Sequence, residues 1–200
     1  MSTKNTPKPA RLATFVEEVV RIAESEEDRG KAITQIDPLF KELLSRPDFL
    51  DEESTRPIPG KFAQYLLYRK ENRSLSVMAM VVPSGCATPV HDHLAWGLVG
   101  VYQGTQQETV YRRLDDGAEP TRATLVQTGA RTLRVGDITH LLPPDGDIHM
   151  IETLDKDQAS ISIHVLGNDI GCKWRHAFDL EKDRVHDFRS GYVNAECDED

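Results

Sequence analysis

The 200-residue sequence has few cysteines, few basic residues and no long apolar run. Its three cysteines, Cys86, Cys172 and Cys197, share no Cys-x-x-Cys spacing, which argues against a disulfide framework or a zinc knuckle. We therefore expect reduced thiols. The 24 Lys and Arg residues against 33 Asp and Glu residues give a net charge of −9, so no basic stripe is present to bind nucleic acid or an anionic membrane.

Targeting and membrane signals are also lacking. No apolar run approaches the length that spans a bilayer, and the start MSTKNTPKPARLATF has no apolar core of a signal peptide. We expect a cytoplasmic protein that binds small molecules or proteins, with neither nucleic acid nor membrane as a partner. A homo-oligomer stays open. The length suits a single domain with a substantial core.

The N-terminal quarter, residues 1–50, predicts a helical segment that packs on the rest of the chain. Residues 1–10 are polar and contain two prolines, so we expect them to be disordered. The next stretch has apolar residues at helical spacing. A second helix is expected with Asp37 as its N-cap, Pro38 at its first position and Pro47 at its end. The apolar positions of the two helices are Leu12, Phe15, Val16, Val19, Ala23, Leu39, Phe40, Leu43 and Leu44.

Residues 51–190 predict an all-β core. Short β-rich runs alternate with turn signals at roughly ten-residue spacing, which is typical of a sandwich or a jelly-roll barrel. The runs are FAQYLLYRK, LSVMAMVVP, WGLVGVYQG, ETVYRRL, ATLVQTG, RTLRVGDITHLLP, HMIETL and SISIHVLG. A last strand or turn is expected around residues 174–178. Residues 191–200 form an acidic tail that we expect to fray.

Two histidines stand one residue apart in the stretch GCATPVHDHLAWGLVGVYQG. In extended backbone residues i and i+2 point to the same face, so His91 and His93 present two imidazoles into one space, which suits a metal. A third ligand would come from another strand. His140, His149 and His164 are all candidates, and His149 is best placed because it follows a Pro-Asp-Gly turn into a strand.

The spacing of this stretch resembles the first motif of the cupin superfamily, through Gly85, His91, His93, Gly97 and Gly104. The second cupin motif resembles a later stretch, which has Thr153 where Asn is usual; its matching residues are Gly136, Pro144, Gly146 and His149. The resemblance covers residues 61–179. It implies a double-stranded β-helix, the cupin jelly-roll barrel, with a metal held at its mouth by His91, His93 and His149. The alternative is that the histidine pair lies in a surface loop.

The carboxylate ligand that most metal-binding cupins supply is replaced here by Gly97. The expected site is therefore three neutral imidazoles, which leave the metal its full 2+ charge and open positions for an anionic substrate such as a thiolate. Imidazole ligation suits iron, zinc, copper and nickel, so the ligands alone do not identify the metal.

Three-histidine cupins with an HDHxxWG stretch and a later SxH resemble the thiol dioxygenases, the cysteine dioxygenase family. The resemblance implies Fe(II), O2 and conversion of a small thiol to its sulfinate, with Ser162 and His164 as the catalytic hydrogen-bond relay. The relay tyrosine of the family is replaced by Leu166, and Gly97 excludes the family's Cys-Tyr crosslink. Water, Tyr102 or Tyr111 are candidates for the phenol's place. The alternative for His164 is a purely structural strand histidine.

Two arginines are candidates to bind the carboxylate of such a substrate, because guanidinium matches carboxylate geometry. Arg69 and Arg175 each resemble an arginine position of this family. If both face the metal, the pocket suits a dicarboxylate of the mercaptosuccinate type. The alternative is that each is a surface arginine paired with one of the many acids.

The leading hypothesis is thus a mononuclear non-haem iron dioxygenase of a small carboxylated thiol, such as cysteine, 3-mercaptopropionate or mercaptosuccinate. One alternative is a three-histidine cupin that cleaves a β-dicarbonyl. Another is a metal- or ligand-binding cupin without turnover.

Overall fold

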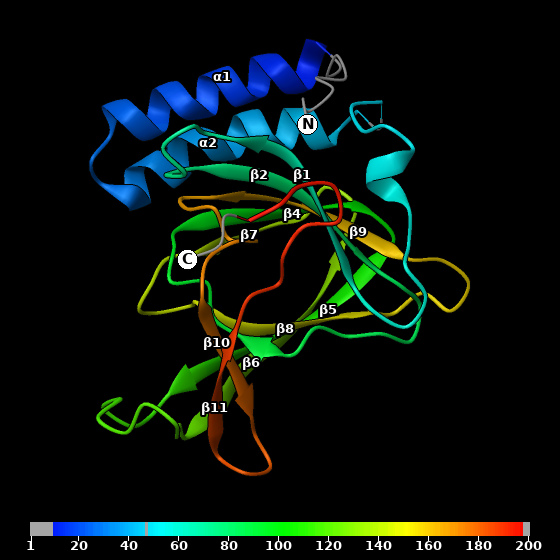
Figure 1. Cartoon of the computed structure of the whole chain (residues 1–200). Coiled ribbons are helices and arrows are strands. Elements are labelled where there is room, and N and C mark those ends of the chain that lie inside the picture. Colours follow the sequence, from blue (N-terminus) through cyan, green and yellow to red (C-terminus); the bar gives the residue numbers. More distant parts are fainter. Residues whose placement is uncertain (1–9, 47, 198–200) are drawn as a thin grey trace.

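The computed structural model describes residues 10–46 and 48–197. Of residues 1–10, which the sequence predicted to be disordered, residues 1–9 lie outside the described part and Ala10 begins a helix. Two helices cover one face of a barrel made from two antiparallel sheets (Figure 1). The helices are α1 (Ala10–Ser25) and α2 (Arg29–Leu44), followed by a short 3-10 helix, η1 (Glu53–Thr55). Neither α1 nor α2, nor any other helix within the described residues, is long and apolar enough to cross a membrane.

The two sheets contain eleven strands among the described residues. The five-stranded sheet has the order β1-β2-β9-β4-β7, and the six-stranded sheet has the order β11-β10-β3-β8-β5-β6. The strands are β1 (Ala63–Arg69), β2 (Ser76–Val82), β3 (Val90–His91), β4 (Gly97–Gln103), β5 (Thr105–Arg113), β6 (Leu125–Arg134), β7 (Ile138–Leu141), β8 (Ile148–Thr153), β9 (Ser160–Leu166), β10 (Arg175–Asp179) and β11 (Arg184–Phe188). The double-stranded β-helix of the cupin type, predicted from the sequence, is confirmed.

The middle strand of the five-stranded sheet illustrates how the barrel interior is built. Every residue of β9 is buried, and successive side chains point to opposite faces. Ile161, Ile163 and Val165 pack with α1 and α2 in the main apolar core. Ser162 and His164 consequently point into the barrel, where the register places His164 between Met78 of β2 and Val99 of β4. The barrel interior therefore holds a polar pair among apolar neighbours.

The second helix begins earlier than the sequence predicted. Its N-cap is Asp28, whose side chain accepts a hydrogen bond from the backbone N of Lys31 at 3.1 Å, and Pro38 lies inside the helix. Asp37 is paired instead with His140 of β7 at 2.7 Å. The helix continues through Pro38 because its buried apolar stripe extends to both sides: Ala32, Ile33, Ile36, Phe40, Leu43 and Leu44. Burial of that stripe against the sheet offsets the backbone hydrogen bond that proline cannot donate.

The C-terminal part differs most from the sequence-based expectation. Cys172 and Cys197 form a disulfide, so the prediction of three reduced thiols is wrong for this pair; Cys86 is free. The predicted frayed end is also wrong up to Cys197, since Gly191 and Val193 donate backbone hydrogen bonds to the barrel. Two cysteines 25 residues apart carry no spacing signal, and only the fold brings them together. Disulfides persist mainly in oxidising compartments, and the cytoplasmic location stays a prediction.

Candidate metal centre

Three buried histidines converge inside the barrel near one of its openings. His91 ends β3, His93 follows two residues later in extended backbone, and His149 lies on β8 directly opposite His91 in the strand register. The ring centroids are 4.8, 4.9 and 5.0 Å apart, an almost equilateral triangle. One nitrogen from each ring lies within 4.8 Å of the others. The predicted set His91, His93 and His149 is therefore brought together in a geometry that could hold a metal ion.

The hydrogen bonds of the outer ring nitrogens determine which nitrogen faces the site. Nδ1 of His91 bonds to the carbonyl of Pro89 at 2.9 Å, and Nδ1 of His93 bonds to the carbonyl of Asp147 at 3.1 Å. Nδ1 of His149 bonds to a carboxylate oxygen of Glu108 at 2.8 Å. Carbonyls and carboxylates only accept, so each Nδ1 carries the proton and each Nε2 keeps its lone pair.

Burial favours the neutral form of His91 and His93. It holds the pKa of His91 well below its usual value, with further lowering by His93, His149 and Arg175. Burial also lowers the pKa of His93, against the opposing effect of Asp147. The Nε2 atom of His149 is buried without a hydrogen-bond partner in the described residues. Such an atom is costly unless something binds it, and neutral imidazole is the form that binds a metal. The residues present fit a divalent metal.

Two acidic residues that the sequence did not single out support the triad from outside. The Glu108 carboxylate accepts from His149 and also from Arg131 of β6. Burial raises the pKa of Glu108, but the contacts with His149 and Arg131 outweigh this effect and the pKa stays below its ordinary value. The Asp147 carboxylate accepts from the backbone N of His93 and of Leu94, both at 3.0 Å. Gln106 and Glu108 stand at alternate positions of β5 and so share one face of the strand. Two polar residues on the same strand face were the signal from which Glu108 could have been found.

Changing Glu108 to glutamine should weaken metal binding about 10- to 100-fold, the range seen when a second-shell partner of a ligating histidine is altered. The substitution keeps the shape and removes the charge that orients His149. Competition with a chromogenic chelator measures the effect. Glu152→Gln on β8 is the matched control, since Glu152 is exposed and should leave metal affinity unchanged. Equal affinity of the two variants would show that Glu108 does not orient the ligand.

Ser162 and His164, which the sequence predicted as a relay, lie within hydrogen-bonding distance of each other. The Oγ of Ser162 lies 3.0 Å from Nε2 of His164, and the amide Nε2 of Gln106 donates to the Oγ atoms of Ser160 at 3.1 Å and Ser162 at 3.4 Å. Because Gln106 can only donate through this nitrogen, the Ser162 hydroxyl is free to donate to His164. The proton of His164 then sits on Nδ1, which is buried and has no partner in the described residues.

Leu166 occupies the place of the missing tyrosine and explains why position 97 is glycine. A Cβ on Gly97 would lie 2.5 Å from Cδ2 of Leu166 and 2.7 Å from the carbonyl oxygen of Val165. A carboxylate side chain at this position therefore has no room. The absence of a protein carboxylate from the ligand set follows from packing between two adjacent strands.

Gly97→Ala should consequently destabilise the fold by about 1–3 kcal/mol, the usual range for overpacking a core. A denaturant titration measures the change. Gly129→Ala on β6 is the control, because nothing lies within 4 Å of a Cβ built there. Combining Gly97→Ala with Leu166→Ala should recover part of the loss caused by the clash. No difference in stability between the two glycine variants would contradict the proposed packing constraint.

Arg175 is a buried cationic residue whose charge acts on the histidines. It is 2% exposed, and its charge contributes to lowering the pKa of His91, His93 and His164. The guanidinium lies over the ring of Phe188, 4.4 Å from the centroid, and donates to Ser190 at 3.2 Å. Its Nε and Nη1 are buried without partners in the described residues. Burial lowers its pKa to about 10, so it stays cationic at neutral pH.

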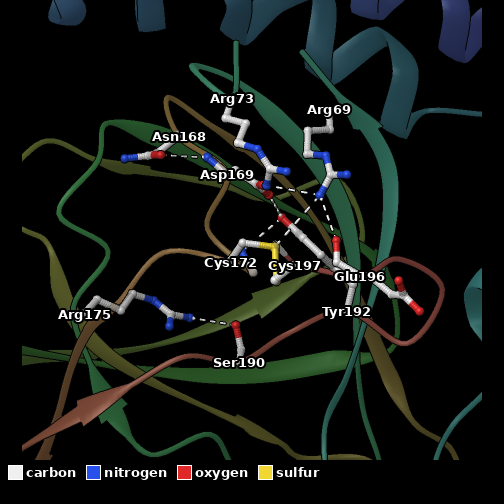
Figure 2. The surroundings of a disulfide bond; sticks show 11 residues. Arg69, Arg73, Asn168, Asp169, Cys172, Arg175, Ser190, Tyr192, Glu196 and Cys197 are labelled. Atoms are coloured by element: carbon white, nitrogen blue, oxygen red, sulfur yellow. Dashed lines mark hydrogen bonds and ion pairs between the residues drawn. A yellow bond between two sulfur atoms is a disulfide. The ribbon is translucent and has the colours of Figure 1, made fainter. Parts of the chain in front are cut away.

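Arg69 lies elsewhere and has other partners. Its Nη1 contacts a carboxylate oxygen of Asp169 at 3.4 Å and the backbone carbonyl of Glu196 at 3.2 Å (Figure 2). The structure thus places Arg175, and not Arg69, beside the histidines. Of the two arginines suggested for a dicarboxylate, Arg175 is the one with buried nitrogen atoms, Nε and Nη1, that have no partner in the described residues.

Neither tyrosine suggested for the missing phenol lies at the relay. Tyr102 packs edge-on against Phe49 with centroids 5.0 Å apart, on the helix side of the sheet. Tyr111 packs with Val90 and Phe178 in a separate cluster. The tyrosine that contacts the cluster containing Leu166 is Tyr192, which the sequence did not single out.

No family model matches the chain. Among solved structures, the chain is similar to a double-stranded β-helix protein from Klebsiella pneumoniae, with 17% identity over 61% of this chain and 90% of that one and a TM-score of 0.43. It is also similar to a cupin superfamily protein from Desulfitobacterium hafniense, with 14% identity, 62% and 94% coverage and a TM-score of 0.42. An oxalate oxidase in complex with glycolate gives 18% identity, 62% and 61% coverage and a TM-score of 0.44. At these identities the likeness concerns the fold alone.

Proposed function

We propose that the protein is a mononuclear iron dioxygenase that oxidises the thiol of a small monocarboxylated thiol to a sulfinate. The observation that carries the proposal is a buried guanidinium with two unpartnered N–H groups beside three buried imidazoles with free lone pairs. This arrangement suits a ligand with two anionic ends, a carboxylate and a thiolate. The sequence motifs shared with the thiol dioxygenases support the same reaction.

Arg175 would bind the carboxylate. Its Nε and Nη1 have no partner in the described residues, so they are available to donate charge-assisted hydrogen bonds to a carboxylate. The ring of Phe188 packs against the guanidinium of Arg175, and its centroid lies 6.2 Å from that of His91. Phe188 therefore lies beside both Arg175 and His91. A substrate held at Arg175 would reach the triad with its other end. One such arginine favours a monocarboxylate of the cysteine or 3-mercaptopropionate type over a dicarboxylate.

Fe(II) held by His91, His93 and His149 would supply the redox chemistry that couples a thiolate to O2, which these side chains cannot provide alone. The reaction RSH + O2 → RSO2H places both oxygen atoms on sulfur and needs no further reductant. The chain's own contribution would be to hold the three imidazoles together, to position the carboxylate and to keep the ligands away from bulk water. All three ligand histidines are at most 5% exposed.

His164 would donate a hydrogen bond into the chamber. Gln106 donates to Ser162 and Ser162 donates to Nε2 of His164, so the proton of His164 lies on Nδ1. Burial holds the pKa of His164 well below its usual value, so the ring stays neutral. A neutral donor at this position can stabilise negative charge that develops on oxygen without itself being titrated. Leu166 leaves no hydroxyl for the relay to continue along β9, so the relay ends at His164.

Oxygen uptake by the Fe(II)-loaded protein tests the proposal. The panel is cysteine, 3-mercaptopropionate, mercaptosuccinate, cysteamine and acetylacetone. We expect uptake with a monocarboxylated thiol, and much less with cysteamine, which lacks the carboxylate, and with mercaptosuccinate, which carries a second one. Uptake with acetylacetone alone would support β-dicarbonyl cleavage instead. No uptake by a protein that demonstrably holds iron would overturn the proposal and favour a binding function without turnover.

A further inference from the structure

The last described segment of the chain runs from the six-stranded sheet to the five-stranded sheet (Figure 1). We call residues 190–197 the C-terminal strap; it leaves β11 and runs across to β1, the edge of the five-stranded sheet (Figure 1). Val193 donates to the carbonyl of Gln64 at 2.8 Å, and the side chain of Asn194 bonds both backbone groups of Leu66 at 2.8 and 3.1 Å. The strap therefore binds the free edge of β1.

The strap interlocks with the loop that follows β9. Tyr192 accepts from the backbone N of Gly171 at 3.0 Å and donates to Asp169 at 2.8 Å. Its ring lies so close to Gly171 that a Cβ there would be 2.3 Å from it. The ring also packs against the cluster of Met78, Ala95, Val99, Leu141, Leu166 and Ile170. Met78 and Val99 of this cluster flank His164 in the register, so Tyr192 packs against the same apolar cluster that borders His164.

A disulfide and two arginines hold the far end of the strap. Cys197 is bonded to Cys172, directly after Gly171 (Figure 2). Arg69 donates hydrogen bonds to the buried Asp169 carboxylate and to the backbone carbonyl of Glu196. Arg73 donates to the Asp169 carboxylate at 2.8 Å. Both cysteines are partly exposed, so a small reductant can reach them.

The near end of the strap contacts the proposed carboxylate-binding arginine. The Oγ of Ser190 accepts from Nη2 of Arg175 and leaves Nε and Nη1 directed elsewhere (Figure 2). Residues from Ser190 to Val193 also form one wall of a groove of about 370 Å³, whose other wall includes Phe62 and Gln64 of the β1 side. Displacing the strap would release Ser190 and widen this groove.

We propose that the strap positions Arg175 through Ser190 and that the Cys172–Cys197 disulfide controls this positioning. A dithiol reductant transfers two electrons to the disulfide: the sulfur–sulfur bond breaks, the reductant's own two sulfurs join, and its two protons go to the new thiols. The freed strap loses one of its anchors, and binding of a carboxylated thiol weakens. The effect on substrate rests on the proposed function, whereas the release of the strap does not.

Thiol counting is the first step of the test. The unreduced, denatured protein should react with a thiol reagent at Cys86 alone, giving one thiol per chain. Three thiols would overturn the proposal. Hydrogen exchange followed by mass spectrometry then compares Cys197→Ser with the unchanged protein. Peptides that contain Gly191 and Val193 should exchange about tenfold faster in the variant, while β2 is unchanged. Cys86→Ser is the control and should match the unchanged protein.

Anaerobic binding of 3-mercaptopropionate to the Fe(II) protein tests the second part of the proposal, the positioning of Arg175 for substrate binding. Cys197→Ser and Ser190→Ala should each weaken binding roughly tenfold, the size expected when one hydrogen bond to a charged group is lost, with cysteamine binding unchanged. Equal exchange in Cys197→Ser and the unchanged protein overturns the anchoring of the strap by the disulfide. Faster exchange with unchanged affinity overturns the positioning of Arg175. If the unchanged protein binds no thiol, the proposed function fails, and faster exchange still supports the redox-controlled release of the strap.

Discussion

His149→Ala should abolish metal retention. Two imidazoles remain in this variant, and neither Glu108 nor Gly97 can replace the third ligand, since Glu108 lies behind His149 and position 97 is closed by Leu166. Loss of a second-shell partner alone costs about 10- to 100-fold in metal affinity, so loss of a ligand should exceed this range. Elemental analysis of the purified variant, after reconstitution with Fe(II), gives the metal content directly.

His140→Ala is the matched control for this experiment. His140 is a strand histidine, but its ring is paired with Asp37 of α2 at 2.7 Å and it does not belong to the triad. This variant should retain the metal content of the unchanged protein. Stoichiometric iron in His149→Ala would contradict the ligand assignment, and loss of iron from both variants would point to a general effect on folding.

Arg175→Ala should raise the KM for a carboxylated thiol without removing the metal. A hydrogen bond to a charged group contributes about 1.5–3 kcal/mol, which corresponds to roughly 10- to 150-fold in kcat/KM. Cysteamine, which has no carboxylate, should react with unchanged kcat/KM. Loss of activity with the carboxylated thiol alone would indicate a lost contact with the carboxylate. Loss with both substrates would indicate a general disturbance of the site, because Arg175 also packs on Phe188.

Arg112→Ala provides the comparison for Arg175→Ala. Arg112 is exposed on β5, and its removal should change neither substrate. Arg175→Lys keeps the charge and loses the planar fork, so it should recover only part of the activity. Unchanged kinetics in Arg175→Ala would mean that the substrate is anchored by another group.

The sequence predicted the parts of the site that depend on local spacing. His91 and His93 share a face because extended backbone alternates, and His149 follows a recognisable turn into a strand, so the ligand set was accessible before the fold was known. Ser162 and His164 were singled out by the resemblance to the thiol dioxygenases, and strand alternation adds that they share one face. Their geometry depends only on the positions i and i+2 of one strand, which the sequence contains.

Features formed between distant segments were not accessible in this way. Glu108 and Asp147 act through histidines 41 and 54 residues away, and only the pairing of the strands brings them together. The Cys172–Cys197 disulfide and the contact of Tyr192 with Gly171 depend on a strap that the acidic composition suggested would fray. The early start of α2 was missed because Asp37 and Pro38 have the local pattern of a helix start. In the structure these residues lie inside α2, whose buried apolar stripe extends to both sides of them.

The ratio of O2 consumed to sulfinate formed, measured with the Fe(II)-loaded protein and 3-mercaptopropionate or cysteine, tests the central claim most directly. A thiol dioxygenase gives a ratio of one, because both oxygen atoms reach the same sulfur, and His149→Ala should give neither uptake nor product. Oxygen uptake that yields disulfide and peroxide in place of sulfinate would contradict the proposed reaction, because it would show that the metal oxidises thiols without transferring oxygen to them.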